Sequence, residues 1–309
     1  MKQQRPVSLV VHGGAWNIPG DQADAHRTGV LDALKAGWKV LKDGGTAVDA
    51  VERSIIVMEN DDTFNAGRGS ALDAAGEIEL DASIMEGGKL RAGAVAAVQN
   101  VANPISVARA IMEQSDTVLL VGLGAARFAK EHGIATCGQD ALITAREIAR
   151  WREAQASGGE PPVRRKRGVQ SPSPGDTVGA VALDAKGNIA SGTSTGGTPN
   201  KHQGRVGDSA LIGCGIYADN TVGGVSSTGW GEAIIRVVMA KSVIEIMQSN
   251  GDDPERAAKD AIAVLKKKTG GQGGVIVLSA SGGVGIAFNT PRMARAFITS
   301  SIKGPIAAV

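Results

Sequence analysis

Six stretches of the chain have the sequence pattern of helices. Residues 21–42, 45–59, 140–155 and 231–248 carry apolar side chains three and four positions apart, which places them on one stripe of a helix. Residues 103–115 begin with Asn-Pro, and residues 254–268 follow Asp253 with Pro254 at the first helical position, so both have good helix starts. We therefore predict six helices, in two groups separated by the middle of the chain.

Short apolar runs between these stretches predict strands. Single strands are expected at 6–14, 92–101, 117–124 and 223–228, and hairpins at 70–85, 177–197 and 273–288. The first hairpin would turn at Ala75-Gly76 and the second at Lys186–Asn188, while the third would end the fold. Hairpins outnumber strand–helix alternations, which favours antiparallel sheets covered by helices over a doubly wound parallel sheet. The fold class predicted is α+β.

Residues 156–176 interrupt this pattern. The segment holds four prolines, four glycines and a basic cluster at 164–167, and no core could be made from it. We expect a flexible linker there. It stops at Asp176, and an apolar strand follows at once from Thr177. A long structureless loop inside a compact domain is expected only where it is functional or disordered.

Composition narrows the class of protein. The chain has 309 residues, 42% hydrophobic, with a net charge of +2, which suits one large domain and indicates neither nucleic acid nor a membrane surface as partner. The N-terminus shows no secretory signal, and the two cysteines, Cys137 and Cys214, form no spaced pair. We therefore expect a reduced, cytoplasmic setting. The 43 glycines gather in loops, which suggests a site built largely from main chain.

Several short motifs resemble those of other kinds of protein but lack residues that those functions require. Residues 192–196 fit G-x-S-x-G and residues 12–15 resemble an oxyanion loop. The last histidine, His202, however lies only eight residues after Ser194 with no acidic residue between them, so the distant base that a serine hydrolase requires is missing. Residues 122–127 lack the third glycine of a dinucleotide loop, so we interpret them as a strand-to-helix turn. The four histidines have no metal-ligand spacing. The basic run at 164–167 is more typical of a solvated loop than of a polyanion site.

Thr177 stands out as a candidate nucleophile. A threonine inside a chain needs a neighbouring base, and no His–Asp pair is evident. Cleavage just before Thr177 would supply one, because the new α-amino group has a pKa of roughly 7.7–8.0 and belongs to the same residue as the hydroxyl. Its β-branched side chain also keeps that hydroxyl in few rotamers. A loose linker ending at Asp176 and a rigid strand from residue 177 are what such a reaction needs.

Several further motifs, in the same order along the chain, resemble the plant-type asparaginase and isoaspartyl peptidase family of N-terminal nucleophile hydrolases. The resemblance covers essentially the whole chain and rests on HGGAW (12–16), FNAGRGS (64–70), ELDASIMEG (79–87), AGAVAAV (92–98), NPISVAR (103–109), GDTVGAVALD (175–184), TSTGG (193–197), GRVGDS (204–209) and STGWGE (227–232). No single motif would be specific, but the ordered set is.

The resemblance implies an αββα sandwich of two mainly antiparallel sheets, formed by residues 1–309 as one domain. It also implies a precursor that cuts itself between Asp176 and Thr177 into fragments of 176 and 133 residues. The family usually pairs two such heterodimers. Its members cleave the β-amide of L-asparagine and of β-aspartyl dipeptides through a β-aspartyl-threonyl ester, with no organic cofactor.

Site roles follow from the same resemblance. Thr177 would be the nucleophile in maturation and turnover, and Thr195 would help to hold and activate its amino end. Thr228 through its hydroxyl and Gly229 through its N–H would form the oxyanion hole. Asn65 would be a nearby polar support for maturation.

Substrate binding and a cation site are implied in the same way. Arg205 would bind the substrate α-carboxylate, a task that suits its planar guanidinium, and Asp208 would bind the α-ammonium group. In bacterial relatives the loop at 58–68 holds a structural sodium ion. Its ligands here would be the main-chain oxygens of Met58, Glu59, Asp61, Phe64, Ala66 and Arg68.

Two departures leave the substrate range open. Asp176 precedes the nucleophile where many relatives have glycine, and glycosylasparaginases share this Asp-Thr pair. Trp230 occupies a position where close relatives often have a small polar residue, and its indole could reshape the leaving-group side. Glycosylasparaginase activity is thus one alternative. A non-catalytic scaffold that never matures is another, although the retained site residues argue against it.

Overall fold

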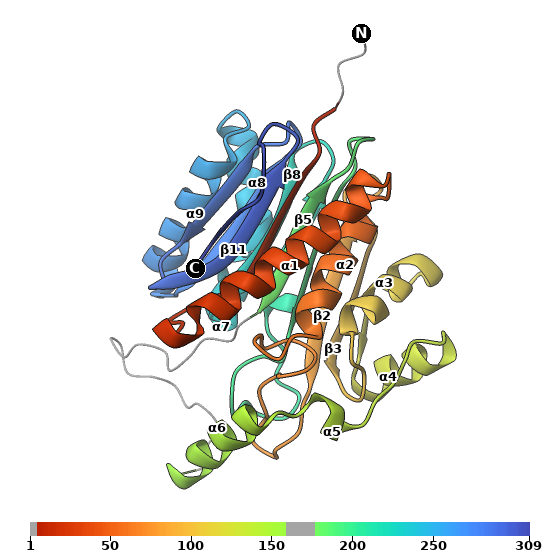
Figure 1. Cartoon of the computed structure of the whole chain (residues 1–309), viewed down its shortest axis with the longest axis vertical. Coiled ribbons are helices and arrows are strands. Elements are labelled where there is room, and N and C mark those ends of the chain that lie inside the picture. Colours follow the sequence, from red (N-terminus) through yellow and green to blue (C-terminus); the bar gives the residue numbers. More distant parts are fainter. Residues whose placement is uncertain (1–4, 159–176) are drawn as a thin grey trace.

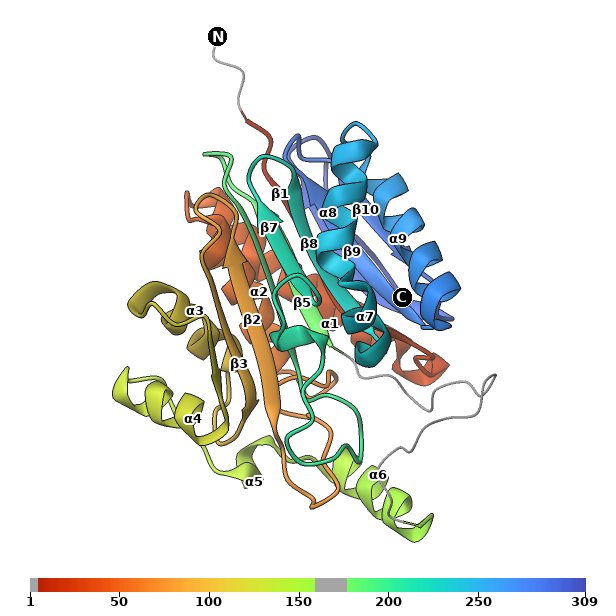
Figure 2. The ribbon, with the colours of Figure 1, turned by 180° about the vertical axis from the view of Figure 1, so that it is seen from behind.

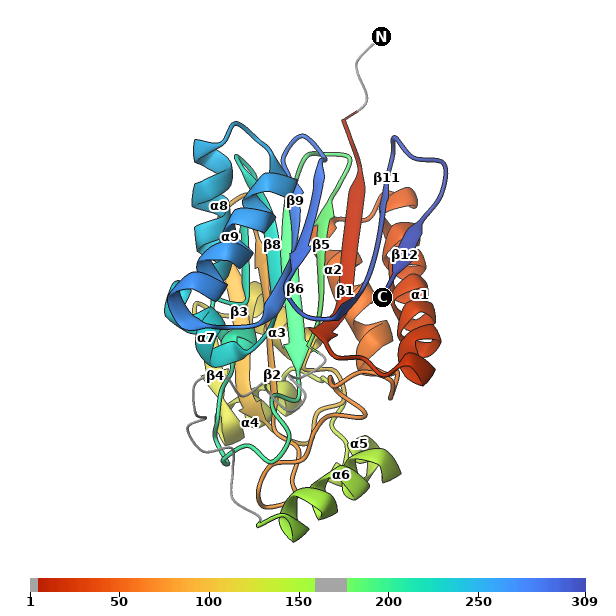
Figure 3. The same ribbon diagram turned by 90° about the vertical axis from the view of Figure 1, so that its left-hand side faces the viewer.

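The computed structural model describes residues 5–158 and 177–309, arranged in four layers with two sheets between two layers of helices (Figures 1 and 3). The larger sheet has the spatial order β12 (Ile306–Ala308), β11 (Arg292–Thr299), β1 (Ser8–Trp16), β5 (Val178–Leu183), β6 (Ile189–Thr195), β2 (Leu80–Glu86), β3 (Ala92–Val98) and β4 (Leu119–Val121). The smaller sheet has the order β10 (Val284–Phe288), β9 (Gly273–Ser279), β8 (Gly223–Gly229) and β7 (Ile216–Asp219). Only the β3–β4 pair is parallel, so the predicted α+β fold with two mainly antiparallel sheets is confirmed.

Helices cover the outer face of each sheet (Figures 1 and 2). The larger sheet is covered by α1 (Ala23–Lys42), α2 (Ala47–Glu59) and α3 (Pro104–Gln114), with α4 (Gly122–Glu131), α5 (Gln139–Leu142) and α6 (Ala145–Ala156) beyond them. The smaller sheet is covered by α7 (Gly231–Val237), α8 (Met239–Ser249) and α9 (Pro254–Thr269). No helix in the described residues is long and apolar enough to cross a membrane.

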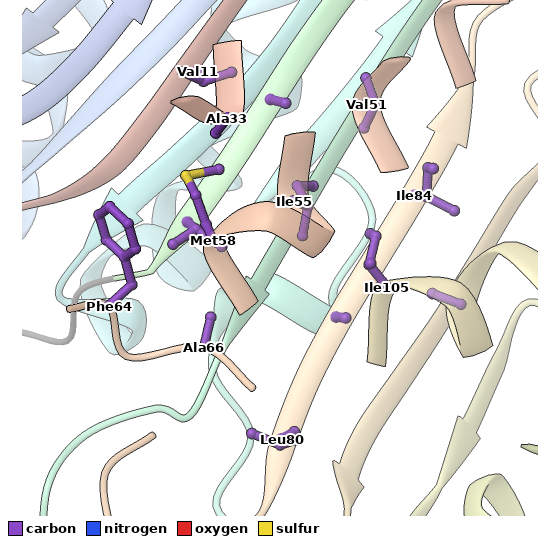
Figure 4. Packing of buried hydrophobic residues seen from close by; sticks show 14 of the residues in the cluster. Val11, Ala33, Val51, Ile55, Met58, Phe64, Ala66, Leu80, Ile84 and Ile105 are labelled. Atoms are coloured by element: carbon purple, nitrogen blue, oxygen red, sulfur yellow. The ribbon is translucent and has the colours of Figure 1, made fainter. Parts of the chain in front are cut away.

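Side-chain alternation along the strands divides the core into three apolar layers. In β1, Leu9 and Val11 pack toward α1 and α2, whereas Val10 packs between the sheets. Figure 4 shows the first of these layers, where Ile55 and Met58 of α2 point toward the larger sheet. In β5, Val181 belongs to the layer between the sheets. Odd-numbered residues of β5 therefore face the second sheet, and Thr177 continues that row.

Local sequence signals explain how several helices begin and end. The Thr46 hydroxyl accepts a hydrogen bond from the Asp49 N–H and the Asp49 carboxylate accepts one from the Thr46 N–H, which is a capping box at the start of α2. The predicted cap of α9 is confirmed, because the Asp253 carboxylate accepts a bond from the Arg256 N–H at 2.9 Å. That helix ends at Gly270, whose φ of +70° is favourable for glycine.

Four predictions about elements were wrong. Residues 70–73 form no strand, because Asp73 accepts hydrogen bonds from the Ala75 and Glu77 N–H groups in a turn. The helix predicted at 140–155 is two helices, since the chain is extended at Ile143 and Thr144.

The other two errors lie in the second half of the chain. The helix predicted at 231–248 breaks at Val238, whose φ is +48°. The hairpin at 273–288 is not terminal, because β11 and β12 follow and β11 pairs with β1. The linker prediction cannot be compared beyond Gly158, because residues 159–176 lie outside the described part.

Candidate active site

Thr177 lies directly before β5, one residue outside the paired part of the strand. Val178 pairs with Gly13 of β1 and with Ser194 of β6, whereas Thr177 is paired with no strand within residues 5–158 and 177–309. The residue is 5% exposed, and its Oγ1 donates a hydrogen bond to Thr195 Oγ1 at 3.1 Å. The sequence-predicted pair Thr177 and Thr195 is therefore in direct contact.

Thr195 also anchors the glycine loop that follows β6. Its Oγ1 accepts a bond from the Gly197 N–H at 3.0 Å. Asn65 holds the same loop from the other side: its Nδ2 donates to the Gly197 carbonyl at 2.7 Å, and its Oδ1 accepts from the Ala71 N–H at 2.8 Å. Asn65 thus supports one wall of the pocket.

Arg205 faces the same pocket from the loop before the 3₁₀ turn η2 (Asp208–Ala210), and Asp208 faces it as the first residue of that turn. Arg205 forms an ion pair with Glu232 of α7, at 2.8 Å between Nη2 and Oε1. Asp81 of β2 holds the loop, since its Oδ2 accepts a bond from the Gly207 N–H at 2.9 Å. The two predicted substrate-binding charges are therefore fixed by neighbouring elements.

The Asp208 carboxyl of this pocket has a strongly shifted pKa. Its side chain is 4% exposed, and its Oδ2 has no hydrogen-bond partner in the described part of the chain. Burial raises the pKa of Asp208 to about 7, although the Arg205 guanidinium opposes this shift. A buried carboxylate with a vacant acceptor is suited to a cationic ligand, since an ammonium group would supply both the charge and the donor.

Thr228 and Gly229 end β8 on the opposite sheet. Thr228 is fully buried, and its Oγ1 has no partner among the described residues. Gly229 has a φ of +134°, and a Cβ there would lie 2.6 Å from the Gln272 carbonyl oxygen. Glycine is therefore required at this position. The unpaired hydroxyl is a donor available to a developing oxyanion.

Most of the predicted site residues line one small pocket, whereas Thr228 and Asn65 lie beside it and are not part of its lining. Its lining consists of Thr177, Thr195, Gly197, Thr198, Arg205, Gly207, Asp208, Gly229 and Gly231. A hydroxyl nucleophile, a fixed cation and a buried carboxylate thus line a pocket formed by both sheets and the loops at their ends. The cleavage-site residue Asp176 lies outside the described residues.

Three residues near the pocket were not predicted from the sequence. Glu232 pairs with Arg205, and His12 contacts the main chain of Thr177. Lys201 is 1% exposed and donates to the Glu79 carbonyl at 2.8 Å; its burial lowers its pKa. Lys201 lies between the motifs TSTGG (193–197) and GRVGDS (204–209), and this position in the sequence could have indicated that it is near the pocket. The motif HGGAW at 12–16 contributed to the resemblance, but it assigned no role to His12.

The rejected motifs are indeed placed where they cannot serve those chemistries. Ser194 alternates with Thr193 and Thr195 and shares its face of β6 with Gly192, which packs against Val51 and Ile55 of α2. It therefore faces the helix layer, away from the pocket. Gly122 begins α4 directly after β4, which confirms the strand-to-helix turn. No group of three or more His, Cys, Asp or Glu side chains among residues 5–158 and 177–309 could hold a metal ion.

The predicted cation loop offers main-chain oxygens. The Glu59 carbonyl accepts a bond from the Arg68 N–H at 2.8 Å, and the Asp61 carbonyl accepts one from the Phe64 N–H at 3.1 Å. Gly67 and Gly69 bring the backbone close, because a Cβ on them would lie 2.6 Å from Glu59 O and 2.9 Å from Phe64 O respectively. Each of these two carbonyls keeps a second lone pair, and main-chain oxygens are a type of ligand that suits a hard cation such as sodium. The ion itself stays a prediction.

The chain is similar in sequence to several known proteins. A family model described as asparaginase matches residues 4–306. A Xenopus laevis protein named isoaspartyl peptidase/L-asparaginase is 45% identical over 294 residues, which cover 95% of this chain and 92% of that protein. Proteins of the same name from Danio rerio (42% identity; 92% and 90% covered) and Homo sapiens (43%; 90% and 88%) are also similar.

Proposed function

The chain belongs to the asparaginase family, and from this we infer that it is a hydrolase that cleaves the β-amide of L-asparagine and of β-aspartyl (isoaspartyl) peptides. One observation carries the inference to this chain's own residues: the Thr177 hydroxyl shares a pocket with Arg205 and Asp208. A cation and an anion three residues apart suit the free α-carboxylate and α-ammonium groups of an aspartyl unit.

We propose that the precursor cuts itself between Asp176 and Thr177, giving fragments 1–176 and 177–309. Thr177 lies where such a cut needs it, just outside the strand ladder and beside Thr195. The two fragments would remain associated, because β5 and β6 of the second fragment lie between β1 and β2 of the first. The released α-amino group would then act as the base for the hydroxyl of its own residue.

In the proposed turnover, Arg205 and Asp208 hold the amino-acid end of the substrate. The Thr177 oxygen attacks the β-carbonyl carbon, the Thr177 amine takes the hydroxyl proton, and that proton passes to the leaving amine. The Thr228 hydroxyl and the Gly229 N–H stabilise the oxyanion. Water, deprotonated by the same amine, then hydrolyses the β-aspartyl-threonyl ester and frees L-aspartate.

No organic cofactor is required by this scheme. A sodium ion held by the main-chain oxygens of residues 58–68 would stiffen the loop that carries Asn65, without a part in the chemistry. We also propose a dimer of αβ heterodimers and a cytoplasmic location; the free state of Cys137 and Cys214 is compatible with a reducing compartment. Nucleic acid and membranes are not proposed as partners.

Intact mass and a substrate panel test the proposal. We expect two fragments divided before residue 177, and hydrolysis of L-asparagine and β-Asp-Leu in preference to a glycosylated asparagine. A chain that stays uncut for days and inactive on all three would support the scaffold alternative. Preference for the glycosylated substrate would instead indicate a glycosylasparaginase.

A further inference from the structure

His12 of β1 connects the two sheets directly behind the candidate nucleophile. Its imidazole is fully buried. Nδ1 lies 3.0 Å from the carbonyl oxygen of Thr177, and Nε2 lies 2.9 Å from the hydroxyl oxygen of Ser226 on β8. One ring thus contacts the nucleophilic residue on the larger sheet and a residue near the oxyanion group on the smaller sheet.

The partners determine which nitrogen carries the proton. A carbonyl oxygen only accepts hydrogen bonds, so the His12 Nδ1 must donate to Thr177. Nε2 of the neutral ring then accepts from the Ser226 hydroxyl at 2.9 Å, so the single hydroxyl proton goes to Nε2 rather than to the more distant Gly192 carbonyl at 3.3 Å. Burial lowers the pKa of His12 to about 3, so the ring stays neutral at ordinary pH. The ring therefore holds the Thr177 carbonyl and the Ser226 hydroxyl in place and does not transfer protons.

Thr177 needs such a partner because of its place in the strand. The ladder ends at Val178, so no neighbouring strand is paired with Thr177. Orientation of its carbonyl sets the ψ angle of Thr177, and with it the direction in which the side chain leaves the backbone. The next carbonyl, that of Val178, is likewise held by a side chain, the Thr193 hydroxyl at 2.8 Å.

The second contact of the ring reaches the oxyanion side. Ser226 and Thr228 are two residues apart on β8, so their side chains share the face toward the larger sheet. Gly179 of β5 leaves room for the pair, because a Cβ there would overlap both His12 Nε2 and Ser226 Oγ. The glycine at position 179 thus allows His12 to contact both Thr177 and Ser226.

We propose that His12 is a positioning residue, which holds the Thr177 hydroxyl at a fixed place relative to Thr228 across the gap between the sheets. The inference rests on the proposed function. Because His12 contacts neither Arg205 nor Asp208, it should influence kcat and the rate of self-cleavage while leaving KM nearly unchanged.

Replacing His12 by asparagine or by glutamine distinguishes a positioning role, which needs the hydrogen bond to Thr177, from a role in packing alone. In His12→Asn the amide nitrogen is bonded to Cγ, as Nδ1 is, so it can still donate to the Thr177 carbonyl. In His12→Gln the amide lies one bond further out, near the place of Nε2. We expect kcat on L-asparagine to fall about 10- to 100-fold in His12→Gln and to be largely restored in His12→Asn, with KM within about twofold in both.

Ser226→Ala and Ser191→Ala form the second comparison. Ser191 Oγ donates to the Val225 carbonyl, so it is another buried hydroxyl between the same two sheets, but four residues along from the site. We expect both to lower Tm, and only Ser226→Ala to lower kcat per cleaved enzyme, the cleaved fraction being measured by intact mass. A variant that stays uncut supports the proposal if it is folded and if His12→Asn matures.

Three results would overturn the proposal. These are equal kcat in His12→Gln and wild type, equal losses in His12→Asn and His12→Gln, or equal effects of Ser226→Ala and Ser191→Ala on kcat. Failure of the proposed function is distinguishable, since the wild-type chain would then show no asparagine hydrolysis at any stage of maturation.

Discussion

The proposed role of the buried Asp208 carboxyl predicts that ligand binding depends on pH. In the empty pocket its pKa is raised to about 7, chiefly by burial. The ligand's α-ammonium group requires the ionised form. With that pKa, about nine tenths of the carboxyl is ionised at pH 8 and about one tenth at pH 6. The apparent affinity for L-aspartate should therefore fall about tenfold per pH unit below 7, and should level off above pH 8.

The assay is calorimetric titration of the mature enzyme with L-aspartate and, as control, with succinate, which has both carboxylates but no ammonium group. The Thr177 amine also titrates near neutral pH, but it affects both ligands, so the ratio of the two dissociation constants isolates Asp208. We expect the preference for L-aspartate to shrink by about tenfold between pH 8 and pH 6, since the ionised fraction changes by that factor. At pH 6, L-aspartate binding should also release about one proton, visible as a buffer-dependent enthalpy.

The sign of the effect is what tests the reasoning. Ligand binding brings a positive charge to Asp208 and lowers its pKa, so protons must be released and binding must strengthen as pH rises. A preference for L-aspartate over succinate that stays constant from pH 5.5 to pH 8 would refute the assignment of Asp208 as the ammonium site. The charges that face Asp208, namely Arg205, Glu232 and Asp81, are already included in its pKa.

Three further predictions concern the other groups of the pocket. Thr177→Ala should give a single uncut chain by intact mass, and cleavage before residue 177 in this variant would remove the hydroxyl from the maturation step. Arg205→Lys should raise KM for L-asparagine about tenfold or more while maturation proceeds, because a lysine cannot form two parallel bonds to a carboxylate; an unchanged KM would contradict its role. Thr228→Val keeps the shape of the side chain and removes the donor, so kcat should fall about 10²- to 10³-fold with little change in Tm, and a kcat equal to wild type would exclude this hydroxyl from the oxyanion hole.

Much of the fold could be predicted from local sequence signals. The capped helix at 254–269 and the hairpin of β5 and β6 depend on neighbouring residues alone, and both were predicted within a few residues. The failures occurred where distant parts of the chain decide. Residues 70–73 look apolar enough for a strand, but they run beside the loop at 200, where the Asn200 N–H donates to the Leu72 carbonyl. β11 is completed by pairing with β1, almost three hundred residues away.

The candidate site divides in the same way. The sequence by itself predicted which residues would carry the chemistry: a threonine after a proline-rich segment and, through the resemblance to a known family, an arginine and an aspartate among glycines. Only the tertiary structure decided how these groups behave. The pKa of Asp208, the first residue of η2, depends on its burial against α7, and the neutral state of His12 depends on its burial between two sheets. Burial and hydrogen-bond partners come from residues far apart in the chain, so they exist only once the sheets have packed.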